Sequence, residues 1–523
     1  MNVTPECGRV EKVKLCQPPS EVHLADLPLQ ESSDMGVGMV SKIGGPIMVR
    51  RGIRIWTVIL IATCGIGRCG AEPFADGDVI CFLGDSITKG GLYSGFVELF
   101  YVTRFPDRRI DFHNCGCGGD RAAAIIQAAD YRLEDDVFAR HPTHVVVMLG
   151  MNDVERTLYG TKAGVDDVVA ARRTAIERYR EGLDEICRRV VSHGAKLILV
   201  TPSCYDETAV INAPNREPLV GVNDALAECA TVVRGLAAKH GAIVADAHAL
   251  MDRINRETQA RDPTFSVTGA GQAWNDRVHP GPVGSFLITN ALLTAQGPFP
   301  PVATIALDTA GAAGPERCTI EQFEAADGRL TFTCREEGLP CVLPEAATRG
   351  LDLVPFTDSC NRESLRVRGL DPGDYELLID DESIGVFSSA DYQIGINLAE
   401  LPNTPQYRQA RQVTAQQEIV RRAGENLREP ATVRYGLAKR VLVKKNSEAQ
   451  VDWRAPAAYE AYVRALVAKE TNPSRLVRWL RVALEEVEHP GTLTGTHTEA
   501  VAELRRLAQP VAHRYEIVRV ASR

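Results

Sequence analysis

The feature that most constrains the fold is an alternation, between residues 75 and 298, of short apolar runs with longer stretches of helical spacing. The apolar runs have the length of buried strands and cover residues 78–83, 109–114, 144–149, 196–200 and 242–245. The helical stretches between and after them cover residues 120–140, 165–192, 223–240 and 281–296. Strands that alternate with helices of this length predict one α/β domain, in which helices cover both faces of a parallel sheet.

Three of these runs end in polar or glycine-rich motifs. Ser86 follows the first run in Gly-Asp-Ser, Gly119 closes a glycine-rich turn after the second, and Asn152 follows the third in Gly-Met-Asn-Asp. In a doubly wound sheet of order 2-1-3-4-5 the carboxyl ends of the first three strands are neighbours, so the three motifs would meet in one crevice. A serine there can attack a carbonyl, while a backbone N–H and an amide N–H stabilise the developing oxyanion. Taken alone, each motif is better explained as a turn or a helix cap.

A fourth motif lies far downstream, in the sequence Asp-Arg-Val-His that ends at His279. An aspartate three residues before a histidine, here Asp276, can accept a hydrogen bond from one imidazole nitrogen and fix the tautomer. The other nitrogen is then free to take the serine proton. A lone histidine in a loop is more often structural, but the four motifs together supply a nucleophile, a base, an orienting acid and oxyanion donors. The sequence therefore predicts Ser86, His279 and Asp276 as catalytic residues.

The four motifs resemble the blocks of the SGNH (GDSL) hydrolase family over about residues 78–290. The family's blocks carry Ser, Gly, Asn and His, which fall here on Ser86, Gly119, Asn152 and His279. The resemblance implies a flavodoxin-like, three-layer α/β domain in which Ser86 attacks an ester carbonyl and His279 later activates water to release the acyl-enzyme. It also implies an oxyanion hole made of the Ser86 and Gly119 N–H groups and the Asn152 side chain. The pair of residues before this glycine is unusual for the family, so Gly118 is the alternative N–H donor.

The N-terminal part of the chain has the order of a secretory signal peptide. A basic segment at 48–54 leads into an apolar run at 55–63, and small residues follow up to Ala71. The run is too short to span a bilayer, so residues 48–71 are predicted to be a signal peptide that directs export to the periplasm or the medium. Residues 1–47 are then either a disordered extension or the result of a start codon assigned too early. A signal that stays uncleaved would act as an N-terminal membrane anchor.

Two further regions follow the α/β domain, as expected for a chain of 523 residues. A proline-rich stretch at 297–301 marks the boundary, and residues 302–402 are predicted to form a small β-rich module. Within it, residues 365–370 and 375–379 flank an Asp-Pro-Gly-Asp turn and predict a hairpin. Residues 406–523 have a helical character. Four cysteines between residues 318 and 360 form either two disulfides or small buried apolar groups.

The catalytic residues do not select the substrate, because lipases, thioesterases and polysaccharide acetylesterases act on the same carbonyl group. Export, the appended β-rich module and the lack of a lid-like amphipathic helix near the motifs favour acetyl or other short acyl groups on carbohydrate. The alternatives are a lipase, lysophospholipase or thioesterase activity, another small ester, and a non-catalytic binding module of the same fold.

Composition narrows the class of partner. The formal net charge of −9, from 59 basic and 68 acidic residues, argues against a nucleic-acid-binding protein, which needs a basic face to displace counterions. The expected partner is a small-molecule or polysaccharide ester, with no nucleic acid and no stable membrane partner beyond export. No cofactor is expected, and no metal either, since His141 and His144 lack nearby carboxylate or cysteine partners in the sequence.

Overall fold

The computed structural model describes residues 73–160, 166–211, 217–268, 276–326, 328–444, 454–469 and 475–520. Residues 1–47 and the predicted signal segment 48–71 lie outside these residues. The described residues belong to one compact unit, which starts at Arg68. Among them, no helix has both the length and the apolar character needed to cross a bilayer.

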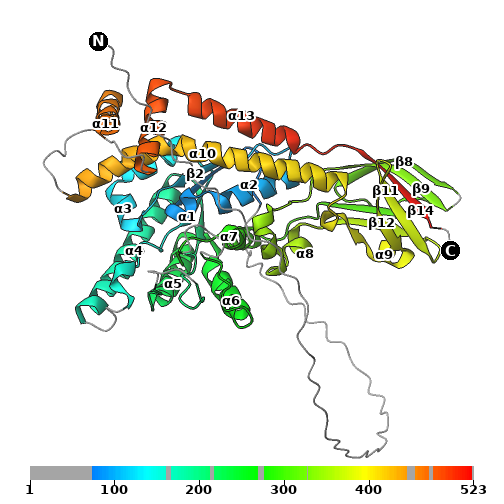
Figure 1. Cartoon of the computed structure of the whole chain (residues 1–523), viewed down its shortest axis with the longest axis horizontal. Coiled ribbons are helices and arrows are strands. Elements are labelled where there is room, and N and C mark those ends of the chain that lie inside the picture. Colours follow the sequence, from blue (N-terminus) through cyan, green and yellow to red (C-terminus); the bar gives the residue numbers. More distant parts are fainter. Residues whose placement is uncertain are drawn as a thin grey trace, which may run out of the picture. The chain divides into compact units, whose positions relative to one another are not determined.

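The α/β domain is built on a five-stranded sheet whose order, β2-β1-β3-β4-β5, confirms the predicted order (Figure 1). All four pairings between neighbouring strands are parallel. The strands are β1 (Val79–Gly84), β2 (Asp111–Gly116), β3 (His144–Met148), β4 (Lys196–Val200) and β5 (Ile243–Ala245). Because β2, β1 and β3 are neighbours and parallel, their carboxyl ends lie together at one edge of the sheet.

Helices cover both faces of this sheet, since β3 is buried at every position and β1 at all but its first. The helices fall into two packed groups, α3-α4-α5 and α2-α7-α6. They are α1 (Ser86–Lys89), α2 (Leu92–Arg104), α3 (Ala122–Gln127), α4 (Asp166–Ser192), α5 (Val222–His240), α6 (Ala247–Gln259) and α7 (Pro282–Ala295). These three layers confirm the predicted fold class.

The long helix predicted over residues 120–140 is not present as one element. The segment contains α3, then a π-helical turn at Asp130–Glu134 and a 3₁₀ turn at Phe138–Arg140. The reason is hydrogen bonding: Arg132, within the π turn, is buried and donates to the Asp120 side chain in the loop after β2 and to the Cys115 carbonyl in β2. π turns of this kind often occur at functional sites.

The second region is a β-sandwich of two sheets. One sheet has the order β13-β10-β6-β7 and the other β12-β11-β14-β9-β8. The strands are β6 (Ala303–Asp308), β7 (Gly311–Ala312), β8 (Cys318–Ala326), β9 (Arg329–Glu336), β10 (Glu363–Arg368), β11 (Asp374–Ile379), β12 (Glu382–Ser388), β13 (Ile396–Asn397) and β14 (His513–Arg519). Buried side chains from both sheets form one hydrophobic cluster.

The predicted hairpin between residues 365–370 and 375–379 is wrong. β10 pairs with β6 and β13, whereas β11 pairs with β12 and β14 in the other sheet. The Asp-Pro-Gly-Asp turn carries the chain across the sandwich instead of folding it back on itself. Leu365 and Leu377, one from each strand, face the same core from opposite sheets.

The third region is helical, with α10 (Pro405–Lys444), α11 (Pro456–Lys469), α12 (Arg475–Glu488) and α13 (Thr492–Leu507). In Figure 1, α10 and α13 lie side by side, and α10 also packs on α2 and β2 of the α/β domain. The region does not stay helical to its end, as predicted for 406–523, because β14 inserts between β9 and β11. In β14 the residues His513, Tyr515 and Ile517 are buried in alternation, which is the period of a strand.

The cysteines of the 318–360 stretch decide between the two alternatives that the sequence left open. All four cysteines of the 318–360 stretch are free thiols, and only Cys318 among them is not fully buried, so they act as small apolar groups.

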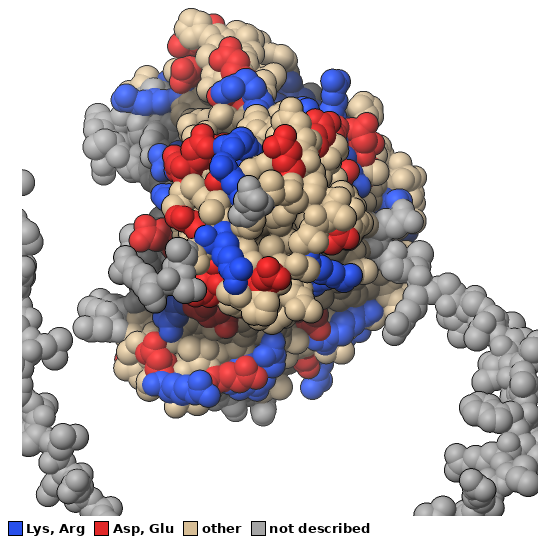
Figure 2. Space-filling view, turned by 90° about the vertical axis from the view of Figure 1, so that its right-hand side faces the viewer, with Lys and Arg blue, Asp and Glu red and all other residues tan. Residues whose placement is uncertain are grey.

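On the face shown in Figure 2, basic and acidic side chains are interspersed rather than gathered by sign.

Candidate active site

The three side chains predicted to be catalytic lie in one hydrogen-bonded line. Ser86 Oγ is 2.8 Å from His279 Nε2, and His279 Nδ1 is 2.5 Å from Asp276 Oδ2. Asp276 Oδ1 also accepts from the backbone N–H groups of Val278 and His279, at 3.1 and 2.9 Å. Burial alone would raise the pKa of Asp276, but the hydrogen bonds from His279 outweigh it and lower that pKa to about 2. The carboxylate therefore stays ionised at neutral pH and holds the imidazole in one orientation.

Ser86 stands at the first position of α1, directly after β1. Asp85 caps this short helix, because its Oδ1 accepts from the Ile87 N–H at 2.9 Å. Asp85 is buried, and burial raises its pKa to about 6 despite this hydrogen bond. Ser86 itself remains half-exposed, so its hydroxyl can be reached from solvent.

The predicted oxyanion donors surround the same point. Asn152 Nδ2 donates to the Asp120 carbonyl at 3.1 Å and to Asp85 Oδ2 at 3.3 Å. These two partners are the chain neighbours of Gly119 and Ser86, so all three predicted donors lie close to one another. Gly119 is exposed and has a φ of +75°, a left-handed conformation that glycine adopts without strain.

Residues 82–285 match the model of the GDSL-like lipase/acylhydrolase family. This match confirms the resemblance to the SGNH (GDSL) hydrolases over that part of the chain. The acetylxylan esterase of Geobacillus stearothermophilus is a relative, 24% identical over 238 residues, which are 42% of this chain and 94% of the relative. This relationship and the likeness to solved structures show that the protein is a carboxylic ester hydrolase of the SGNH type.

The likeness to solved structures extends beyond the family's catalytic domain. A structure described as BT4096, a gut microbial diltiazem-metabolizing enzyme, is 28% identical with a TM-score of 0.72 and covers 86% of this chain and 99% of its own. LAE5, an alpha/beta hydrolase enzyme from the metagenome of Lake Arreo, is 28% identical with a TM-score of 0.33 and covers 43% of this chain and 97% of its own. The coverage by the first structure shows that its likeness to this chain extends beyond residues 82–285.

Two arginines of this GDSL hydrolase shape the site without having been predicted. Arg277 has a φ of +62°, and its Nη1 donates to the carbonyls of Asp206 and Ala209 at 3.0 and 3.1 Å. A left-handed backbone is unfavourable for a non-glycine residue and persists only where the surrounding structure holds it. The hydrogen bonds from Arg277 to the loop after β4 therefore hold the loop that carries His279 in place. No local signal in the sequence points to this contact, since its partners are about 70 residues away.

Arg156 is the second unpredicted residue of the hydrolase site. Its Nη1 donates to the Met151 carbonyl at 2.6 Å and lies 3.5 Å from Asn152 Oδ1. Burial lowers the pKa of this guanidinium from its ordinary value, although the nearby Asp85 opposes the shift. Contact with the amide oxygen of Asn152 favours the orientation in which Nδ2 faces the Asp120 carbonyl and the Asp85 carboxylate. Among the described residues, no three side chains of His, Cys, Asp or Glu converge as metal ligands would.

Proposed function

We propose that this GDSL hydrolase removes acetyl or other short acyl groups from carbohydrate through an acyl-enzyme on Ser86. The observation that carries the mechanism is the unbroken line of hydrogen bonds from Ser86 through His279 to Asp276. The substrate class is supported by the relative named acetylxylan esterase. Family membership fixes only the ester-hydrolase chemistry, so the carbohydrate is the specific part of the proposal.

In the first half-reaction, Ser86 Oγ attacks the ester carbonyl carbon and its proton passes to His279 Nε2 at 2.8 Å. Ionised Asp276 stabilises the imidazolium that results. The negative charge on the carbonyl oxygen meets the N–H groups of Ser86 and Gly119 and the Asn152 amide. His279 then returns the proton to the leaving alcohol oxygen as the carbon–oxygen bond breaks, which leaves the acyl group on Ser86.

In the second half-reaction, water takes the place of the alcohol. His279 Nε2 accepts a proton from the water as its oxygen attacks the acyl carbon, and the same donors hold the oxyanion. The bond to Ser86 Oγ breaks, the proton returns to that oxygen, and a carboxylic acid leaves. Every proton transfer uses the one nitrogen that faces Ser86.

A second candidate is an ester that is not a carbohydrate. The similar solved structure that covers most of this chain is described as a diltiazem-metabolizing enzyme, and diltiazem is a drug rather than a polysaccharide. The two candidates share the mechanism and differ only in the alcohol part of the substrate.

The test compares the full chain with its Ser86→Ala variant on p-nitrophenyl esters from acetate to palmitate and on acetylated xylo-oligosaccharides. We expect turnover of the acetate ester and release of acetate from the oligosaccharide, both reduced more than about 10³-fold in Ser86→Ala. Ser192→Ala, which changes an exposed serine at the end of α4, is the matched control. Preference for palmitate would favour a lipid substrate, and activity that survives in Ser86→Ala would overturn the mechanism.

Export is a separate part of the proposal. The basic, apolar and small-residue order of residues 48–71 supports a signal peptide that is cleaved after Ala71. N-terminal sequencing of protein recovered from the cell envelope or medium should give a mature chain that begins at Glu72. An intact N-terminus on active protein would contradict this cleavage.

A further inference from the structure

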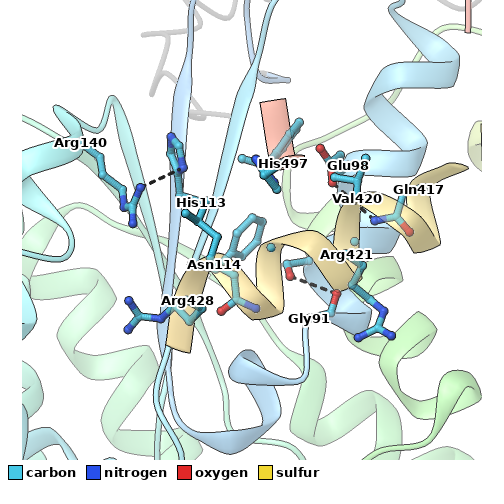
Figure 3. Close-up of a pocket in the computed structure, with 16 residues that line it drawn as sticks. Gly91, Glu98, His113, Asn114, Arg140, Gln417, Val420, Arg421, Arg428 and His497 are labelled. Atoms are coloured by element: carbon cyan, nitrogen blue, oxygen red, sulfur yellow. Dashed lines mark hydrogen bonds between the residues drawn. The ribbon is translucent and has the colours of Figure 1, made fainter. Parts of the chain in front are cut away.

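A side chain of α10, a helix outside the matched region, contacts the end of β2, directly before the loop that carries Gly119. Arg428 of α10 donates through Nε to the Gly116 carbonyl at 3.0 Å, and both of its Nη atoms donate to the Asp136 carboxylate. Arg428 is buried, with an exposed fraction of 4%. Figure 3 shows it extending from α10 beside Asn114, next to the end of β2. Residue 428 lies well beyond 285, where the family match ends.

Asp136 links Arg428 to the loop that carries Gly119, through a second arginine that contacts both Asp136 and this loop. Arg132 donates to Asp136, to Asp120 Oδ2 at 2.8 Å and to the Cys115 carbonyl at 2.8 Å. Cys115 and Asp120 lie before and after the glycine-rich turn, so one buried guanidinium ties its two ends together. The Asp120 carbonyl in turn accepts from Asn152. A chain of hydrogen bonds therefore runs from Arg428 to the predicted oxyanion donors.

The charges in this cluster are balanced only when α10 is in place. Arg132 and Arg428 are the cations and Asp120 and Asp136 the anions, and each has an exposed fraction of 4% or less. Breaking a buried ion pair by removing one partner leaves an uncompensated charge, which is far more costly than losing a pair on the surface. Without Arg428 the two carboxylates share one guanidinium, and the loop that Arg132 holds loses its support.

The same helix also contacts the turn that carries the nucleophile. Lys89 Nζ, three residues after Ser86, pairs with Glu429 at 3.0 Å, and both side chains are largely buried. Arg421 donates to the Gly90 carbonyl at 3.0 Å. Figure 3 shows Arg421 and Arg428 on the one helix, with Gly91 and Asn114 beside it. α10 thus touches both the nucleophile turn and the oxyanion loop.

We propose that Arg428 is a positioning residue of the esterase. Through Gly116, Asp136 and Arg132 it fixes the loop that offers the Gly119 N–H to the oxyanion. The inference rests on the proposed function, because it requires that this loop take part in catalysis at Ser86. It makes α10 a component of the catalytic unit rather than a segment for docking a partner.

The test is Arg428→Ala in the full chain, with Arg422→Ala as the matched control. Arg422 is on the same helix, is mostly exposed and pairs only with Glu418 among the described ion pairs. In Arg428→Ala we expect kcat for p-nitrophenyl acetate to fall about 10- to 100-fold with KM changed less than about threefold, since oxyanion geometry acts on the transition state. Added guanidinium ion should restore part of the lost kcat, and Arg422→Ala should match the parent.

A second readout isolates the oxyanion hole. A boronic acid that forms a tetrahedral adduct on Ser86 should bind Arg428→Ala more weakly by about the factor lost in kcat. A role confined to stability would lower the unfolding temperature and leave boronate affinity per folded molecule unchanged, which would overturn the proposal. So would a folded Arg428→Ala variant with the parent's kcat.

Arg428→Lys covers the case in which the alanine variant does not fold. Lysine keeps the positive charge but lacks the fork that reaches both Gly116 and Asp136. We expect this variant to fold and to have a kcat reduced about 10-fold, and a parental kcat would overturn the proposal. Failure of the proposed function itself would appear differently, as full activity in Ser86→Ala.

Discussion

At the scale of single residues, two carboxyl groups next to the active site are buried, and burial makes their charged form unfavourable at neutral pH. Asp153 follows Asn152, a predicted oxyanion donor, and its Oδ1 accepts from the Ala122 N–H at 2.7 Å. Burial raises its pKa to about 7, and that of Asp85 to about 6. At these two groups the folded protein therefore binds more protons than the unfolded chain between pH 4 and 7.

A pH-dependent stability follows from this difference. Because the native state binds the extra protons at Asp85 and Asp153, the contribution of these two groups to the free energy of unfolding should fall as pH rises from about 4 to 7. In Asp153→Asn, which keeps an oxygen for Ala122, the fall should be shallower and stability at pH 8 higher by on the order of 1–3 kcal/mol. Urea unfolding across this pH range measures both effects. Asp107→Asn, an exposed site, should change neither, and an equally steep slope in Asp153→Asn would refute the assignment.

At the scale of elements, the site depends on how closely α1 approaches the end of β2. A Cβ atom at Gly116 would lie 2.2 Å from the Lys89 backbone N and 2.7 Å from its Cα. These are backbone atoms of the nucleophile helix, so they cannot move aside without displacing Ser86. The glycine thus sets the distance between the nucleophile turn and the oxyanion loop.

Gly116→Ala tests this packing. We expect a loss of about 2 kcal/mol or more in unfolding free energy, as for overpacking of a tight core, and a drop in kcat larger than the stability loss explains. Chemical unfolding and esterase kinetics measure the two. Gly235→Ala is the control, since a Cβ there meets nothing within 4 Å and alanine favours a helix. Parental activity in Gly116→Ala would show that the approach is not needed.

At the scale of the whole molecule, distant parts of the chain complete one another. β14, close to the end of the chain, lies between β9 and β11, and α10 supplies Arg428 to a loop 312 residues earlier. Side chains of α10 and α13, among them Val413 and Leu504, belong to the same hydrophobic core as the parallel sheet. The three regions should therefore unfold together.

Ile517→Ala tests this coupling, because Ile517 of β14 is fully buried in the sandwich. Removing these methyl groups should cost about 2–5 kcal/mol, and esterase activity and circular dichroism should be lost in a single, shifted thermal transition. Val520→Ala, at a site 42% exposed, should leave the transition in place. Two separate transitions, with activity surviving the first, would mean that the sandwich is energetically independent.

The parallel sheet and the four motifs at the ends of its strands could be predicted from the sequence alone. Apolar runs of strand length, and the polar and glycine residues that end them, are local patterns that do not depend on distant partners. The order of the sheet was supposed for a doubly wound fold and agrees with the resemblance to the SGNH family; in that order the strands before Ser86, Gly119 and Asn152 are neighbours. The residues of the hydrogen-bonded line were recognisable for the same reason, since the Asp276–His279 spacing is a property of four consecutive residues.

The contacts between strands and side chains that are far apart in the sequence could not be predicted and are known only from the folded structure. The pattern of residues 375–379 predicted a strand but did not name its partners, so the turn at 371–374 suggested a hairpin that does not form. The strand at 513–519 was missed, because it lies in a region predicted to be helical. Arg277 and Arg428 look like ordinary charged residues in the sequence, because burial and ion pairing depend on loops and helices far along the chain. The free energy of such pairing comes from the contact between two surfaces, so it cannot be inferred from the sequence of either segment alone.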